Sequence, residues 1–433
     1  MILLSNTITP RLRYITDFIG KEITGIEIKL TSDKTDFREY EGAKINYSPE
    51  QVSNNEFWVK PHTLLFESTI SSQTIECFEI KGNKIFFQTT GDFPFDIFAA
   101  TFYLLSRYEE YLPHQKDEYG RYPYQDSLAW KENFLDQPLI NTWVKEFGKA
   151  LKERFPSFTI HHSPFTFLPT YDIDIAWSYK HKGWWRNFGG MVNSVFRGNW
   201  TQLKERINVL SGKQRDPFDT YGWMNGLHER YNLKPYYFFL VADKKGKYDK
   251  NISPSKKVMQ ELIHNHAIRY PVGIHPSWRS GDDISLLKRE INTLSFIAGS
   301  DVRSSRQHYI RFTLPETFRC LIDQGIRFDF SMGYGSINGF RASVSSPFCW
   351  YDLQNEKQTD LILFPFCFMD ANSFYEQKHS AQQALEEMKK YYTAVKSVSG
   401  TFIMIWHNNF FGTDKLFDGW RDIYDQFIKE IAG

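Results

Sequence analysis

The chain has 433 residues, a length that allows two or three domains at roughly 150 residues per domain. Its 52 Lys and Arg residues almost balance its 51 Asp and Glu residues. The net charge of +1 therefore argues against binding nucleic acid or an acidic membrane through bulk charge. A hydrophobic fraction of 41% and a charged fraction of 24% are typical of a globular chain, not a disordered one.

The four cysteines stand apart, with no CxxC pair, which predicts neither a disulfide framework nor a thiolate metal site. No signal peptide is recognisable at the start of the chain, and no apolar run approaches the roughly 18 residues of a membrane span. We therefore expect a cytoplasmic protein without a membrane span. Nothing in the sequence indicates its oligomeric state.

Residues 1–162 are predicted to form a small α+β domain. Two strand-like runs, Ile75–Ile80 and Lys84–Gln88, are joined by a hairpin-type turn at Lys81-Gly-Asn. A helix is expected over Phe95–Tyr108, where apolar side chains recur on one face. We find no pattern of catalytic residues in this region, and its role is not indicated by the sequence.

From residue 163 to 433 the pattern changes to short apolar runs that alternate with amphipathic helices. The runs are Phe165–Tyr171, Tyr236–Val241, Tyr270–Ile274, Val302–Ser305, Ile326–Phe330, Leu361–Phe368 and Thr401–Trp406. Alternation of strands and helices predicts a parallel sheet, and about seven strands are enough to curl into a distorted (β/α) barrel.

Polar residues follow every one of these runs. In order they are Asp172 and Asp174, Asp243, His275, Arg306 and His308, Asp329, Asp370, and His407 with Asn408 and Asn409. Barrel enzymes carry their chemistry at the carboxyl ends of the strands, so the repetition of acids and histidines there predicts an active site on this rim.

Asp172 and Asp174 flank one residue directly after an apolar run, so in an extended chain both side chains point to the same side. Repulsion between two close carboxylates favours one that binds a cation and one that exchanges a proton. His275 and His308 at neighbouring strand ends, together with a carboxylate, match a metal site with an open position. His407 ends the last strand, which would pair with the first in a closed barrel and bring His407 next to Asp172.

The order of these motifs resembles the polysaccharide deacetylase superfamily (NodB-homology, carbohydrate esterase family 4-like), in a branch with an additional N-terminal domain. The matching segments are Thr170-Tyr-Asp-Ile-Asp174, Gly273-Ile-His-Pro-Ser-Trp278, Arg306-Gln-His-Tyr309 and Ile403-Met-Ile-Trp-His407. The resemblance extends over residues 165 to 410 and implies a metal-dependent hydrolase that removes N- or O-acetyl groups from a carbohydrate.

The resemblance also implies a role for each residue. Asp174, His275 and His308 would hold a divalent metal, first of all Zn²⁺, with Mn²⁺, Ni²⁺ or Co²⁺ as alternatives. Asp172 would act as the general base, Arg306 would orient it, and His407 would protonate the leaving group. Trp278, Asp329 and Arg341 are candidates for binding an N-acetylated carbohydrate.

One motif departs from the family pattern. The second motif is His-x-x-x-His in the family, whereas the residue four positions after His275 is Arg279. We expect His308 to replace the missing ligand from the next strand, since neighbouring strands lie about 4.8 Å apart. The alternative is a carbohydrate-binding or assembly protein that keeps the barrel without catalysis. A glycoside hydrolase fits less well, because its two carboxylates flank the scissile bond from opposite sides.

Overall fold

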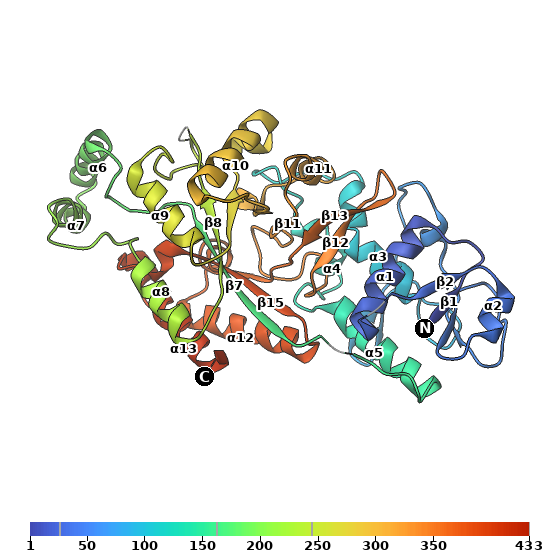
Figure 1. The fold of residues 1–433 in the computed structure, drawn as a ribbon. Helices are drawn as coiled ribbons and strands as arrows, with labels where there is room; N and C mark the ends of the chain where they lie inside the picture. The colour runs from blue at the N-terminus through green and yellow to red at the C-terminus, as the bar shows by residue number, and fades with distance from the viewer. Residues whose placement is uncertain (26, 162, 244–245, 433) are drawn as a thin grey trace.

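The computed structural model describes residues 1–25, 27–161, 163–243 and 246–432 (Figure 1). Residues 162 and 433, at which the two predicted domains end, lie outside the described residues. The chain forms an N-terminal region at one end of an elongated molecule and a larger α/β region at the other (Figure 1). None of the described helices is both long and apolar enough to cross a bilayer.

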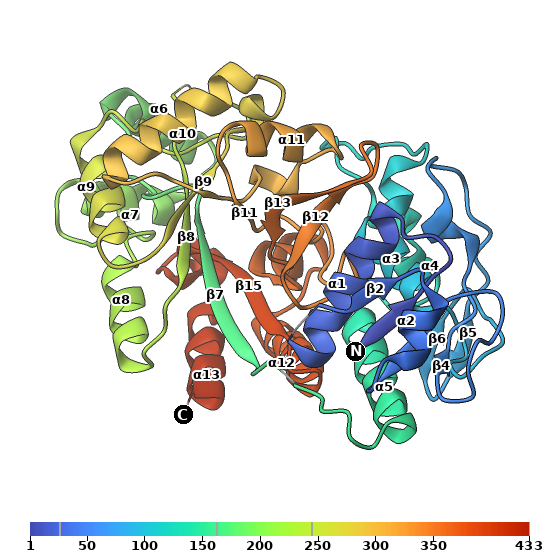
Figure 2. The same cartoon turned by 45° about the vertical axis from the view of Figure 1, so that its right-hand side comes forward.

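The N-terminal region contains a small parallel sheet with the strand order β2-β1-β3-β4, on the right in Figure 2. Its elements are β1 (Ile2–Leu4), α1 (Pro10–Thr24), β2 (Lys29–Thr31), α2 (Lys34–Glu39), β3 (Lys44–Asn46), β4 (Phe57–Trp58), β5 (Phe78–Ile80), β6 (Asn83–Ile85), α3 (Ile97–Leu105), α4 (Leu128–Lys131) and α5 (Leu139–Arg154). The sequence did not predict the parallel sheet, because strands of two or three residues are too short to show a period.

The predicted hairpin and helix of this region are both present. β5 and β6 pair antiparallel, with Ile80 opposite Asn83 across the predicted turn. The helix α3 is shorter than expected, and Asp96 begins it because its carboxylate accepts a hydrogen bond from the Ala99 backbone N–H at 3.0 Å.

The larger region is built on one sheet with helices α8 to α13 around its outside (Figures 1 and 2). Its elements are β7 (Thr166–Ile173), α6 (Trp184–Phe196), α7 (Trp200–Leu210), α8 (Tyr221–Arg230), β8 (Tyr236–Leu240), α9 (Lys257–Ala267), β9 (Val272–His275), α10 (Ile284–Ala298), β10 (Ser304–Ser305), α11 (Glu316–Asp323), β11 (Phe328–Asp329), β12 (Phe348–Asp352), β13 (Lys357–Leu363), β14 (Phe368–Met369), α12 (Ala381–Ser397), β15 (Thr401–His407) and α13 (Trp420–Ala432).

The sheet has the strand order β12-β13-β11-β10-β9-β8-β7-β15-β14. Each of the seven predicted runs overlaps a strand, and the neighbours from β13 to β14 are parallel. The run Leu361–Phe368 was predicted as one strand, but it contributes to two, β13 and β14, which lie near opposite ends of the sheet. The additional strand β12 pairs antiparallel with β13.

The hydrogen-bond ladder of this sheet does not close among the described residues, so full closure of the predicted barrel is not observed. Only Phe364–Cys367 separate the end of β13 from the start of β14. This segment crosses the gap, where the Phe366 N–H donates to the Met332 carbonyl and the Cys367 N–H donates to the Ile403 carbonyl, each at 3.3 Å. The curvature therefore brings the two edges together without a continuous ladder.

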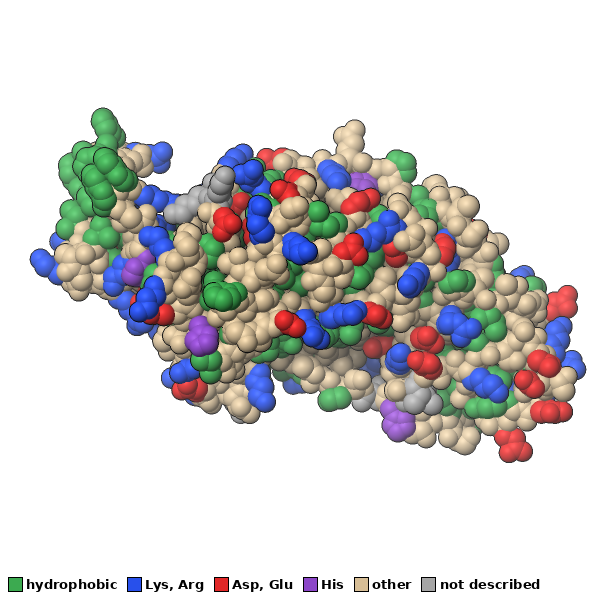
Figure 3. All heavy atoms as spheres, turned by 45° about the horizontal axis from the view of Figure 1, so that its top comes forward, with side chains coloured by type: hydrophobic (Ala, Val, Ile, Leu, Met, Phe, Trp, Pro, Cys, Tyr) green, Lys and Arg blue, Asp and Glu red, His purple; other side chains and the backbone are tan. Residues whose placement is uncertain are grey.

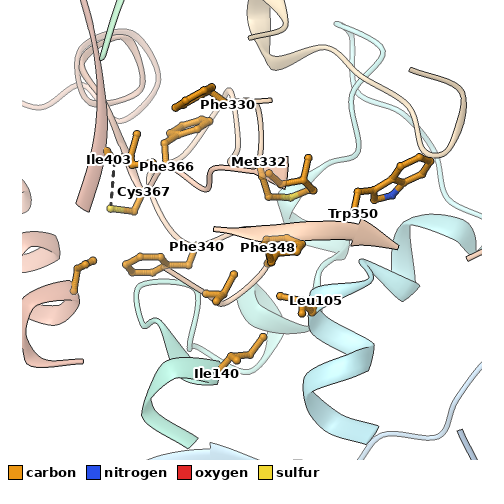
Figure 4. Close-up of a cluster of buried hydrophobic side chains, with 14 of the residues drawn as sticks. Leu105, Ile140, Phe330, Met332, Phe340, Phe348, Trp350, Phe366, Cys367 and Ile403 are labelled. Atoms are coloured by element: carbon orange, nitrogen blue, oxygen red, sulfur yellow. Dashed lines mark hydrogen bonds between the residues drawn. The ribbon is translucent and has the colours of Figure 1, made fainter. Parts of the chain in front are cut away.

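The two regions share one hydrophobic core. Leu105 and Ile140 of the N-terminal region lie beside Phe340, Phe348 and Met332 of the larger region (Figure 4). Side chains from both regions belong to a single contiguous cluster of buried apolar residues. Burial of this surface holds the regions together at roughly 25 cal/mol per Å² of apolar area.

A buried group of charges lies at the same junction. Glu110 pairs with Arg107 at 2.7 Å and with Arg341 at 2.5 Å, and these side chains are at most 4% exposed. Burial alone would raise the pKa of the Glu110 carboxyl, but the two guanidinium groups lower it to about 2. The carboxylate therefore stays charged at neutral pH and depends on both arginines.

Replacing Arg341 with Met should strongly destabilise the fold, because Glu110 would keep a buried charge with one partner fewer. We expect the free energy of unfolding to fall by about 3–5 kcal/mol, measured by urea unfolding. The matched control is Arg327→Met, which removes an exposed guanidinium that pairs with exposed Asp360 at 3.3 Å. The control should lower the free energy of unfolding by less than about 1 kcal/mol. A similar decrease in both variants would contradict a structural role for the Arg341 ion pair.

Candidate active site

The carboxyl ends of neighbouring parallel strands bring the predicted site residues together. β15 pairs with β7 so that His407 lies opposite Asp172, which confirms the predicted neighbourhood of the last and first strands. β9 ends at His275, and β10 is followed by Arg306 and the turn that begins at His308. Residues far apart in the sequence therefore meet at one edge of the sheet.

Asp174, His275 and His308 form a compact group of possible metal ligands. One ligand atom from each lies within 4.8 Å of the others. The Nε2 atom of His275 is 3.2 Å from Asp174 Oδ1, and Nε2 of His308 is 3.4 Å from Asp174 Oδ2. The three residues that the sequence predicted as ligands thus converge, with His308 beside Asp174.

Hydrogen bonds to the other ring nitrogens orient both imidazoles. His275 Nδ1 lies 2.6 Å from the Arg306 carbonyl oxygen, and His308 Nδ1 lies 3.1 Å from Asp249 Oδ1. Because a carbonyl and a carboxylate accept, we assign the proton of each neutral ring to Nδ1. The lone pair of each Nε2 then points towards Asp174, an arrangement that is common in metal sites.

The donor set fits a divalent cation. Asp174 Oδ1 is buried without a hydrogen-bond partner. When the two imidazoles are neutral with the proton on Nδ1, the Nε2 atoms that face Asp174 are acceptors. Burial alone would raise the pKa of the Asp174 carboxyl, but His308 and His275, when they are protonated, lower it well below its usual range. Converging acceptors repel one another unless a proton or a cation lies between them, and two imidazoles with one carboxylate suit a divalent transition metal.

Asp172 is held by Arg306. The Nη1 atom of Arg306 donates to Asp172 Oδ1 at 2.7 Å, and its Nη2 donates to the Thr170 hydroxyl at 2.8 Å. The guanidinium is fully buried over the Phe238 ring. Asp172 Oδ2 is 3.8 Å from His275 Nε2, so the second carboxylate lies beside the candidate ligands with a fixed orientation.

His407 is oriented by Asp370. Its Nδ1 lies 2.7 Å from Asp370 Oδ1, and its backbone N–H donates to Asp370 Oδ2 at 2.7 Å. The remaining nitrogen, Nε2, is 3.5 Å from Asp174 Oδ2. Burial alone would lower the pKa of the His407 imidazole, but Asp370 and Asp174 raise it well above its usual value. The arrangement favours an imidazole that carries a proton.

A cavity of about 600 Å³ lies at this edge of the sheet. It is lined by Asp172, Asp174, His275, His308 and His407 together with the aromatic residues Tyr119, Tyr248, Tyr309, Tyr375 and Phe410 and with other side chains. A volume of 300–1,000 Å³ is typical of small-molecule sites. Tyr119 and Arg121 come from residues 1–162, so the region in which the sequence showed no catalytic pattern contributes to the cavity wall.

The loop that carries His308 has a strained backbone. Tyr309 and Ile310 adopt positive φ angles of 60° and 54°, which are rare for bulky side chains. Arg121 Nη1 donates to the Tyr309 carbonyl at 3.2 Å, and Asp117 binds Arg121 Nε at 2.7 Å. The N-terminal region therefore holds this loop in place.

The three predicted substrate-binding residues do not line the cavity. Trp278 stacks on Tyr248, which lines the cavity, with ring centres 4.0 Å apart. Asp329 is fully buried, accepts hydrogen bonds from Ser305 and Ser331, and has a pKa that burial raises to about 6. Arg341 belongs to the buried ion pairs with Glu110. Asp329 and Arg341 are therefore buried in the interior, away from the cavity.

Sequence reasoning missed the partners of the histidines. Asp370 was noted after a strand, yet its hydrogen bond to His407 could not be inferred. Asp249 lies in a long segment between β8 and α9, and the acid noted after β8 was the exposed Asp243. No local pattern identifies Asp249, because its contact with His308 joins residues 59 positions apart.

The model of DUF7033, a family of unknown function, matches residues 1–156. No curated protein matches the chain significantly.

Several solved structures resemble part of this chain. A protein of Mycobacterium smegmatis assigned as a polysaccharide deacetylase has 13% identity and a TM-score of 0.40, covering 63% of this chain and 87% of that protein. A protein of Pseudomonas aeruginosa with the same assignment has 11% identity and a TM-score of 0.40, covering 62% and 85%. The allantoinase PuuE has 10% identity and a TM-score of 0.40, covering 62% and 84%.

Metal binding should separate the two aspartates. Asp174→Ala should lose a divalent cation that the wild-type protein retains, because it deletes a ligand, whereas Asp172→Asn should keep it. Asp249→Asn should weaken binding by about 10- to 100-fold through the orientation of His308. Metal content after dialysis and calorimetric titration with Zn²⁺ would measure these effects. Exposed His264→Ala is the control; equal metal loss in both aspartate variants would contradict the assignment.

Proposed function

We propose that this protein is a metal-dependent hydrolase that removes N- or O-acetyl groups from a carbohydrate. The observation that carries the proposal is one cavity lined by the Asp174, His275 and His308 cluster, by Asp172 and by His407. Buried Arg306 pairs with Asp172 and buried Asp370 pairs with His407. A ligand cluster, a carboxylate and an imidazole beside it are the parts that hydrolysis of an acyl group requires.

Asp174, His275 and His308 would hold the cation, with Zn²⁺ the first choice and Mn²⁺, Ni²⁺ or Co²⁺ as alternatives. When bound, such a cation supplies Lewis acidity to an acyl carbonyl and to water. Asp172 would accept the proton of the attacking water, as a general base. Arg306 would act as a positioning residue, because its hydrogen bond at 2.7 Å keeps one oxygen of Asp172 fixed and leaves the other towards the cluster.

His407 would donate a proton to the nitrogen or oxygen that leaves as the acyl bond breaks. His407 lines the cavity and its Nδ1 is bound to Asp370, so the ring orientation is set before substrate arrives. Asp370 also favours the protonated ring, as an acid at this position requires. The proton that Asp172 removes from water and the one that His407 donates together balance the reaction.

The aromatic wall of the cavity supports a carbohydrate substrate. Tyr119 and Tyr309 stack with ring centres 5.5 Å apart, and Tyr248 lies 5.2 Å from Tyr309. Rings with a hydroxyl present both an apolar face and a hydrogen-bonding group, which suits the faces and hydroxyls of a sugar. Because Tyr119 belongs to residues 1–162, we propose that the N-terminal region contributes to substrate binding.

Release of acetate from N-acetylated chito-oligosaccharides and from O-acetylated xylan, by protein loaded with metal, tests the proposal. Asp172→Asn and His407→Ala should each lower kcat by about 10² to 10⁴, the range of a general acid or base, and should leave the metal content unchanged. His264→Ala is the control for His407→Ala.

Undiminished activity in either catalytic variant would contradict the assigned role. A metal-loaded wild-type protein that binds these sugars without releasing acetate would favour a carbohydrate-binding protein without catalysis.

A further inference from the structure

The hairpin of helices α6 and α7 exposes an unusual apolar surface. Between β7 and α8 the two helices project at the end of the molecule opposite the N-terminal region (Figure 1). The exposed side chains are Trp184 (63%), Trp185 (71%), Phe188 (53%), Val192 (37%), Val195 (47%), Phe196 (86%), Trp200 (63%), Ile207 (48%) and Leu210 (41%). In Figure 3, hydrophobic side chains gather at this end with Lys and Arg beside them.

The arrangement of polar and apolar side chains on α6 is the reverse of that on a typical surface helix, which buries its apolar face. Its buried side chains are the polar Asn187 and Ser194, whereas its large apolar side chains are exposed. At about 100° per residue, the exposed apolar positions from 184 to 196 fall within an arc of about 120°. A contiguous apolar face of this kind marks an interaction surface.

Hydrogen bonds join the two ends of the α6–α7 hairpin and link its two helices. Asp216, which is 2% exposed, accepts the backbone N–H groups of Ser178, Tyr179 and Lys180 and so ties the start of the insertion to its end. Within it, Arg206 Nη1 of α7 donates to the Asn187 carbonyl of α6 at 3.2 Å. The apolar face is therefore presented by two helices that hold each other in place.

The charge of the hairpin indicates the partner. Residues 180–215 contain eight Lys and Arg residues but only one acid, Glu205, whereas the whole chain has a net charge of +1. Tryptophan and basic residues around an apolar helical face are the composition of helices that lie in the headgroup region of anionic membranes. A helix of 13 residues is about 20 Å long, too short to cross a bilayer core of about 30 Å.

We propose that the α6–α7 hairpin docks the protein onto an anionic lipid bilayer. The apolar face of α6 inserts among the headgroups and upper acyl chains, and the surrounding Lys and Arg side chains bind lipid phosphates. The hairpin follows β7, whose carboxyl end carries Asp172 and Asp174, so residues 174–183 connect the candidate active site to the docking hairpin.

Flotation of the full chain with vesicles tests this docking. Vesicles in which about a third of the phosphatidylcholine is replaced by phosphatidylglycerol should bind the protein at least about tenfold more tightly than phosphatidylcholine alone. Binding should weaken as salt is raised, because ions screen the basic residues.

Two double variants separate the apolar and the charged contributions. Trp185→Ser with Phe196→Ser should lower binding about tenfold or more, as should Arg197→Glu with Lys204→Glu. Their controls lie in the N-terminal region: Phe78→Ser with Trp130→Ser, and Lys34→Glu with Arg38→Glu, all at exposed positions. The controls should bind like the wild type. Unchanged circular dichroism would show that the hairpin variants remain folded.

Failure of the wild-type protein to bind anionic vesicles would overturn the proposal, as would equal losses in the hairpin and control variants. A dimer in solution that Trp185→Ser with Phe196→Ser dissociates, without vesicle binding, would instead assign the face to a second copy of the chain.

Discussion

The register of four neighbouring parallel strands is the constraint on which the candidate site depends. Hydrogen bonds between β15, β7, β8 and β9 place His407 opposite Asp172 and bring His275 to the same edge of the sheet. A slip of one residue would turn each side chain to the other face of the sheet. The core around these strands therefore affects the site directly, because packing of the buried side chains on both faces of the strands fixes the register that aligns the candidate ligands.

Around this edge, hydrogen bonds determine what each polar side chain can do. Asp249 and Asp370 fix the orientation of His308 and His407, and Arg306 fixes one oxygen of Asp172. Each partner is itself buried, so the groups keep their orientation without competition from water. The N-terminal region belongs to the same system, since Arg121 holds the strained loop after His308.

Charged residues are unevenly distributed along the chain, although the net charge is close to zero. Opposite charges cancel over the whole chain, but the residues between Lys180 and Arg215 carry a strong positive excess beside exposed aromatic side chains. At the other end, Arg107, Glu110 and Arg341 form a buried cluster between the two regions. The first arrangement is suited to an external anionic partner, whereas the second stabilises the chain internally.

The sequence by itself was sufficient to predict the alternating strands and helices, the parallel sheet, and the gathering of Asp172, Asp174, His275, His308 and His407 at strand ends. These features depend on local periodicity and on chain order, which a sequence displays directly. Only the tertiary structure revealed the division of Leu361–Phe368 between β13 and β14 and the open hydrogen-bond ladder. It also placed Asp249 beside His308 and Tyr119 in the cavity, while turning Asp329 and Arg341 inward. Such contacts join residues distant in sequence, and they are decided by which surfaces pack together, for which a single sequence carries no local pattern.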